Sequence, residues 1–188
     1  EEEDLHFFLN IFSKNEVGYK NLLNIISRAY MNHKENAYVD IEQLYKNKEG
    51  LLVLSGGNNS ILKYSNGNSI TSQSASFVSD FKKEFIDNFY IEIQRIEGND
   101  YRIDEEVTLN LAYDNDIPVV ATNDVYFEGP DHFEAHDALM CIEKKLFVSQ
   151  KDRKRLSKNH YFKSQIEMQE VFSDIPEALL NTIEIAQR

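Results

Sequence analysis

The stretch that decides the fold of this chain is Pro118-Val119-Val120-Ala121-Thr122-Asn123-Asp124-Val125-Tyr126-Phe127. Its apolar half is rich in valine and too short for a helix, which indicates a buried strand. The strand delivers Asn123 and Asp124 to its carboxyl end, where α/β proteins keep their functional loops. An aspartate there is a natural ligand for a divalent ion, and a histidine two positions later would strengthen the site. Tyr126 occupies that position, so the sequence has the frame of a metal site in which one ligand is replaced.

The segments on either side of this strand alternate between strand and helix patterns. We predict two further strands, at 50–57 and 89–94, and no more. We predict helices after Asn15, which can cap the first of them, and at 70–87, where Phe77, Phe81 and Phe85 repeat every fourth residue. Further helices are predicted at 103–115, from 129–131 and at 165–172. The last begins at Asp174, which could cap it with Glu177 in a capping box. Such alternation predicts an α/β fold with a parallel sheet and outer helices, although three strands are few for a complete barrel of about 250 residues.

Composition excludes several classes of protein. A chain of 188 residues with 41% hydrophobic residues can form one globular domain, 1–188. The net charge of −12 argues against a surface built to grip phosphate backbones. Cys141 is the only cysteine, so an internal disulfide and a cysteine-based zinc site are both excluded, which fits a cytoplasmic protein. The sequence has neither a membrane-spanning apolar run nor a signal peptide, and its acidic start without methionine predicts a fragment of a longer chain.

Three small motifs each have a simpler structural interpretation that we prefer. The glycine turn at 55–58 could cradle an anion, but it lacks the phosphate-loop ending, which favours a tight turn. His132 and His136 have the spacing of two metal ligands on one helix face, but the glutamate of the hydrolytic zinc motif is misplaced, which favours ordinary surface or boundary histidines. Cys141 lies in an amphipathic helix and is predicted to be a buried, inert thiol.

One stretch of this acidic chain is basic. It could contact DNA or an acidic partner, with Arg153, Lys154 and Arg155 at its centre, or it could be a solvated loop, and the sequence leaves both interpretations open. Its basic residues are Lys144, Lys145, Lys151, Arg153, Lys154, Arg155, Lys158 and Lys163.

Several stretches resemble, in order, segments of the bacterial replicative DNA polymerase III alpha subunit. They are Lys14-Asn15-Glu16-Val17-Gly18-Tyr19-Lys20-Asn21-Leu22, Leu54-Ser55-Gly56-Gly57, 118–125 with Phe127, Ala135-His136-Asp137, 172–179, 181–182 and 184–186. The region that they resemble is the amino-terminal PHP domain of that subunit. The resemblance implies a partial, distorted (β/α)7 barrel that lacks its opening strands, with the polymerase palm beginning after residue 188.

The resemblance also implies where metal ligands would lie. In metal-binding members of the family, ligands at strand ends hold two or three divalent ions that activate water against a phosphodiester. The corresponding positions here are Phe8, Gly57 and Tyr126, none of which offers a good ligand, and only Asp124 remains. His6 is two residues from Phe8 but is displaced by about 6–7 Å along a strand. The resemblance therefore implies the branch of the family that has lost its metals, with Asp124 as a vestigial ligand.

We accordingly expect a non-catalytic scaffold that stabilises the alpha subunit and docks its proofreading exonuclease subunit, epsilon. The parent chain would be a DNA-directed DNA polymerase that contacts DNA and the replicative holoenzyme and uses magnesium bound outside this segment, which itself would hold no cofactor. The alternative is a metal-dependent phosphoesterase or 3'-5' exonuclease whose site is rebuilt from His6, Asp124 and other residues. Because a partial barrel exposes strand edges, we also predict that the isolated fragment associates or is marginally stable.

Overall fold

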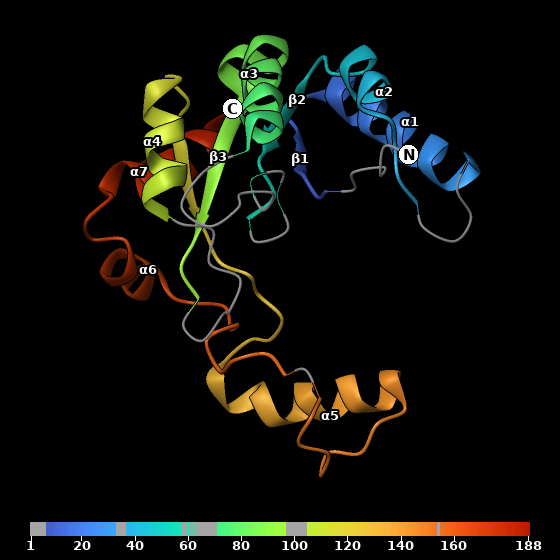
Figure 1. Ribbon diagram of the computed structural model, residues 1–188, viewed down its shortest axis with the longest axis vertical. Helices are drawn as coiled ribbons and strands as arrows, with labels where there is room; N and C mark the ends of the chain where they lie inside the picture. Colours follow the sequence, from blue (N-terminus) through green and yellow to red (C-terminus); the bar gives the residue numbers. More distant parts are fainter. Residues whose placement is uncertain are drawn as a thin grey trace.

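The fold is built on one four-stranded sheet with helices around it (Figure 1). The computed structural model describes residues 7–32, 37–57, 60, 62, 71–96, 105–153 and 155–188, and the statements below concern these residues. The elements are β1 (Asn10–Ser13), α1 (Glu16–Asn32), α2 (Ile41–Lys46), β2 (Leu51–Leu54), α3 (Ser72–Phe85), η3 (Ile86–Asn88), β3 (Phe89–Gln94), α4 (Glu105–Asp114), β4 (Val119–Thr122), η4 (Pro130–His132), α5 (Phe133–Lys144), α6 (Gln165–Val171) and α7 (Pro176–Gln187).

The strands lie in the order β1-β2-β3-β4. β2, β3 and β4 are parallel and confirm the three strands predicted from the sequence. The prediction of parallel strands alone was wrong, because β1 pairs antiparallel with β2, Asn10 opposite Leu54. Its four residues, Asn-Ile-Phe-Ser, are mostly exposed and carry little apolar signal, so pairing with β2 makes this strand.

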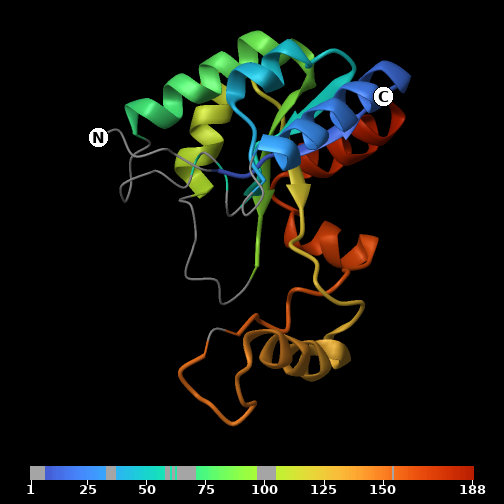
Figure 2. The same ribbon diagram turned by 90° about the vertical axis from the view of Figure 1, so that its right-hand side faces the viewer.

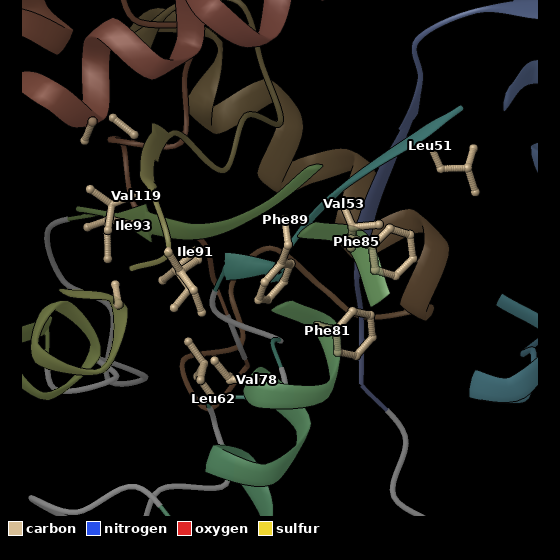
Figure 3. Packing of buried hydrophobic residues seen from close by; sticks show 14 of the residues in the cluster. Leu51, Val53, Leu62, Val78, Phe81, Phe85, Phe89, Ile91, Ile93 and Val119 are labelled. Atoms are coloured by element: carbon tan, nitrogen blue, oxygen red, sulfur yellow. The ribbon is translucent and has the colours of Figure 1, made fainter. Parts of the chain in front are cut away.

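The larger core cluster lies on one face of the sheet. The face is apolar because alternate residues of β2, β3 and β4 point to it, among them Val53, Ile91 and Val119. Helix α3 covers them with Phe81 and Phe85, and the ring of Phe81 stacks on those of both Phe85 and Phe89 (Figure 3). On the other face, Leu52, Leu54, Tyr90 and Val120 form a smaller cluster against which Ile185 packs.

Helix α7 protects the open edge of β4. It packs along this strand, and the Asn181 Nδ2 donates to the Val119 carbonyl at 2.7 Å. Because Ile91 N bonds to the Pro118 carbonyl, the next carbonyl, that of Val119, points away from β3 and needs another donor. The helix thus removes one edge at which a foreign strand could add.

The helix ends show which capping predictions were right. Asn15 Oδ1 accepts from Gly18 N at 2.9 Å, which confirms the cap of α1. The capping box predicted at Asp174 was wrong, because α7 begins at Pro176 after Ile175, which makes no side-chain cap. Asp174 instead binds Arg95 through both carboxylate oxygens, at 2.5 and 2.7 Å, and such a charged bidentate pair is stronger than a cap. A capping box does form on α6, which Ser164 begins.

Helix α5 and the chain that follows it stand away from the sheet as an arm (Figures 1 and 2). The connection is narrow, because β4 continues into 123–126 and a bridge joins Phe127 to Tyr161 where the chain returns. The buried side chains of α5 are Phe133, Asp137 and Cys141, so the helix packs on the returning chain through one face. The predicted burial of Cys141 is confirmed. Among the described residues, no helix combines the length and apolar character needed to cross a bilayer.

The end of α3 offers a stability test. Ile86 has a φ of 48° although it is β-branched, and its side chain is exposed. Because glycine adopts such a backbone without strain, Ile86→Gly is expected to raise the free energy of unfolding by about 1 kcal/mol. Urea denaturation measures the change. The matched control is Ile166→Gly, an exposed isoleucine inside α6, which should lower stability by about 1 kcal/mol. If both substitutions destabilise the protein equally, the backbone at Ile86 is not strained.

Candidate functional site

The candidate site lies at the carboxyl edge of the parallel strands. β2 ends before Ser55 and Gly56, β3 ends at Gln94, and β4 ends at Thr122. Because β1 runs in the opposite direction, its first residue, Asn10, reaches the same edge. All four strands therefore bring polar side chains or backbone groups to one place, as the sequence predicted for the end of β4.

The centre of this edge is the carboxylate of Glu92, which is only 5% exposed. Its side-chain oxygens accept from Asn10 Nδ2 (2.9 Å), Gly56 N (3.2 Å), Gln94 Nε2 (3.1 Å) and Thr122 Oγ1 (2.5 Å). Its backbone N–H also donates to Ser55 Oγ at 2.9 Å. Within the described part of the chain, every donor to the carboxylate is a neutral group, so a buried charge is balanced by hydrogen bonds that join all four strands. We call these residues the Glu92 network.

The glycine turn after β2 belongs to this network. Gly56 and Gly57 have φ of 93° and 54°, so the turn requires glycine. The N–H of Gly56 is directed to Glu92, which supports the tight-turn interpretation over an anion cradle. A Cβ at Gly57 would lie 2.5 Å from the amide of Gln94, and that amide occupies the space that a longer side chain would need.

Asp124 lies just outside the network, next to a histidine that sequence reasoning missed. The Nε2 of His160 is 3.8 Å from Asp124 Oδ2, and the carboxylate is 36% exposed. Partial burial raises the pKa of Asp124, and His160 opposes this change. Ser157 N lies 3.2 Å from His160 Nδ1, which positions the ring. His160 sits among lysines in the sequence, and nothing in its local pattern indicated that it is buried.

The structure also shows where the other aromatic and histidine candidates from the sequence lie. Phe8 is 70% exposed. Tyr126 is half-exposed, and its ring lies edge-on to those of His136 and His160 at 5.7 and 5.8 Å. His132 is exposed, as we preferred. His6 lies outside the described residues.

Asn123, the residue before Asp124 after the end of β4, holds the chain that returns from the arm. Its Nδ2 donates to the Tyr161 carbonyl at 2.6 Å. The Tyr161 hydroxyl donates to Glu167, which also accepts from Ser164 N at 2.7 Å. The edge of the sheet, the arm and α6 are therefore linked in one chain of hydrogen bonds.

This link predicts a pH dependence. The hydrogen bond from Tyr161, with those from Ser164, lowers the pKa of Glu167 from its ordinary 4.5 to about 2. Because the folded-state pKa is the lower one, the stabilisation is present above about pH 4.5 and is lost as the pH falls towards about 2. Glu167→Gln should remove this part of the pH dependence. Urea titrations across this pH range measure it, with Glu170→Gln as the exposed control that should keep the wild-type slope.

The basic stretch is largely committed to contacts within the arm. Arg153 forms a bidentate pair with Asp137, and their side chains are 5% and 4% exposed. This pair holds the pKa of Asp137 below its ordinary value. Arg155 bonds to Glu134 and Asp137, both at 3.2 Å, and lies over the ring of Phe133. Arg153 is therefore not presented to DNA, and Lys154 lies outside the described residues.

Comparison with known proteins identifies the family. Residues 2–96, half of the chain, match the family model described as PHP domain. The chain belongs to the PHP domain family. The match ends directly after β3 and thus includes Gly57 and Glu92, while Asp124 and the arm lie beyond it.

Relatives of the complete chain are replicative polymerase subunits. The DNA polymerase III subunits alpha of Caulobacter vibrioides and Vibrio cholerae are each 38% identical to this PHP chain over 96% of its length. That of Pasteurella multocida is 37% identical over 98%. The chain spans 16% of the length of each of these relatives.

The side chains at this edge do not fit a cluster of divalent ions. Among the residues that the structure describes, no three of the types His, Cys, Asp and Glu are grouped so as to hold a metal. Glu92 is an oxygen donor of the right kind, but neutral N–H and O–H groups already bond to both of its oxygens. Asp124 and His160 are close enough, at 3.8 Å, to contact one ion together, but two ligands fall short of the three protein ligands that an open zinc site uses, and the described residues offer no third.

Proposed function

We propose that this PHP domain is a non-catalytic structural part of a bacterial DNA polymerase III alpha subunit. The observation that carries the proposal is the Glu92 network, in which neutral donors from four strands balance the one buried carboxylate at the site. A catalytic cluster would need that carboxylate and its neighbours to face metal ions. Here the same groups face one another and hold the sheet together.

The rest of the family architecture follows from this assignment. The four described strands form part of a distorted, seven-stranded barrel of the PHP type, in which β1 is one of the two edge strands of the described sheet. The parent chain would catalyse nucleotide transfer to a DNA primer with magnesium bound outside these 188 residues. Two observations support this activity. The relatives are named DNA polymerase III subunit alpha, and the alignments with them cover almost the whole chain.

The metal-free state can be tested in the complete alpha subunit. We expect elemental analysis after incubation with manganese and gel filtration to give the same metal content for the wild type and for Asp124→Ala. Asp131→Ala, an exposed aspartate, is the matched control. A loss of manganese specific to Asp124→Ala would overturn the proposal.

The second candidate is an active phosphoesterase, which the proximity of His160 to Asp124 favours. It predicts hydrolysis of a chromogenic phosphodiester that disappears in both Asp124→Ala and His160→Ala. The structural proposal predicts a rate equal to that of buffer for all three proteins. The complete subunit, free of exonuclease, is the sample for this assay.

We also propose that the domain docks the proofreading subunit epsilon. The test is to titrate the complete alpha subunit with the carboxyl-terminal segment of epsilon and follow the anisotropy of a fluorescent label. Saturation is expected at about micromolar concentration or below. Absence of binding at about tens of micromolar would contradict docking and would leave the metal-free assignment intact.

A further inference from the structure

The end of α5 carries an exposed apolar face. Leu139 and Ile142 are 64% and 73% exposed, and Phe147 and Val148, just after the helix, are 75% and 56% exposed. Leu139 and Ile142 are three residues apart and therefore share one side of the helix, opposite the buried side of Phe133 and Cys141. Such a group of neighbouring large side chains exceeds the scattered exposure expected of a surface. We call these four residues the arm face.

The backbone of the arm face is held in one conformation. Helix α5 ends at Lys144, the next residue, Lys145, is left-handed with a φ of 55°, and Leu146 N donates to the Cys141 carbonyl at 2.9 Å, as in a Schellman motif. Phe147 N then donates to Gln150 Oε1 at 2.7 Å, and Gln150 N returns a bond to the Phe147 carbonyl. These bonds preorganise the turn that displays Phe147.

The buried ion pair between Arg153 and Asp137 holds the same turn. Besides its pair with Asp137, Arg153 donates to the Val148 carbonyl at 3.2 Å. Burying two charges is expensive, so this pair is weak evidence of added stability, and its bond to Val148 gives it a part in positioning the turn. The Arg153–Asp137 pair thus holds the exposed apolar turn that follows α5 in position.

The charge around the arm face selects the partner. The segment 144–158 contains seven Lys or Arg and one acidic residue, whereas the remainder of the chain contains 13 Lys or Arg and 31 Asp or Glu. With Arg153 buried and Arg155 paired, the exposed charges next to the arm face are Lys144, Lys145 and Lys151, which outnumber the exposed acidic residues Glu143 and Asp152. An apolar centre with a lysine rim is complementary to an apolar strip with acidic flanks. A site for duplex DNA would present its arginines to phosphates, whereas here Arg153 is buried and Arg155 is paired.

We propose that the arm face docks an amphipathic helix with acidic flanks that belongs to another part of the same polypeptide. This inference rests on the proposed function, because the relatives are alpha subunits of which this chain spans 16%. In the described residues the arm points away from the sheet and its helices, so they leave its outer face open (Figure 2). Docking there would join the PHP domain to the remaining polypeptide through the arm.

The test is hydroxyl-radical labelling of the complete alpha subunit, without DNA. Phe147 and Phe162 are the same residue type and are 75% and 72% exposed, and Phe162 lies outside the arm face. We expect Phe147 to be oxidised about tenfold more slowly than Phe162. In Ile142→Asp the rate at Phe147 should rise to that of Phe162, because a charge in the apolar contact releases the helix. In Ile166→Asp, an equally exposed isoleucine of α6, it should stay low.

Other occupants give different results. Equal oxidation of Phe147 and Phe162 in the wild type overturns the proposal. Protection that disappears on dilution of the subunit overturns it in favour of a second copy, and protection that appears only with primed DNA overturns it in favour of nucleic acid. Failure of the metal-free assignment appears instead in the manganese content, which labelling of Phe147 does not depend on.

Discussion

Phe81→Ala is expected to lower the free energy of unfolding by about 3–5 kcal/mol, the range for a fully buried aromatic ring. Phe81 is 0% exposed, and its ring lies 5.7 Å from Tyr45, 5.7 Å from Phe85 and 5.4 Å from Phe89 between ring centroids. It therefore joins α2, α3 and β3 at one point. Removing it leaves a cavity between three elements that cannot close on one another without breaking other contacts.

Urea denaturation followed by circular dichroism measures this loss. Phe162→Ala removes the same ring from a 72% exposed position and should change stability by less than about 0.5 kcal/mol. If the wild-type domain is less stable than the expected loss, the variant should be unfolded without denaturant. A loss below that of the control would show that α3 does not depend on this contact.

Glu92→Ala is expected to lower the free energy of unfolding by about 2–4 kcal/mol, because it leaves buried donors without an acceptor. The donors come from β1, the turn after β2, β3 and β4, so the loss affects the whole carboxyl edge of the sheet. Hydrogen exchange should show faster opening at Asn10 and Gly56 in particular. A carboxylate on the surface would have no such effect.

Manganese provides a second readout for this position. If the Glu92 network replaces metal ions, manganese should leave the unfolding midpoints of the wild type and of Glu92→Ala unchanged. Glu170→Ala, on the exposed side of α6, controls for loss of a negative charge and should stay within about 0.5 kcal/mol of the wild type. Stabilisation of the wild type alone by manganese would mean that Glu92 binds a cation.

The sequence predicted the regular elements well where the signal was local. β3 was predicted with the bounds that the structure has, and β2 and β4 within a few residues, because short apolar runs bounded by glycine, proline or asparagine have few other conformations. The cap of α1 by Asn15 depends on a side chain three residues from its partner and was also predicted. The fourfold spacing of Phe77, Phe81 and Phe85 indicated the buried side of α3.

The residues that the sequence did not reveal act through distant partners. Glu92 reads as the polar residue of an alternating strand, yet it is buried because Asn10 and Thr122, 82 and 30 residues away, bond to it. Asp174 has the local pattern of a cap, but Arg95 binds it across 79 residues. Arg153 reads as a surface charge, and only its pair with Asp137 buries it.

The order of residues alone thus determined three of the four described strands and most of the helices, and that Phe8, Gly57 and Tyr126, where the family resemblance implies metal ligands, offer poor donors. The tertiary structure decided that β1 joins the sheet, that the edge carboxylate is satisfied by neutral groups, and that an apolar face is exposed on the arm. The physical reason is the distance along the chain over which each effect acts. Backbone preference and hydrophobic period act over a few neighbours, whereas burial of a charge or an apolar side chain depends on whatever the fold brings beside it.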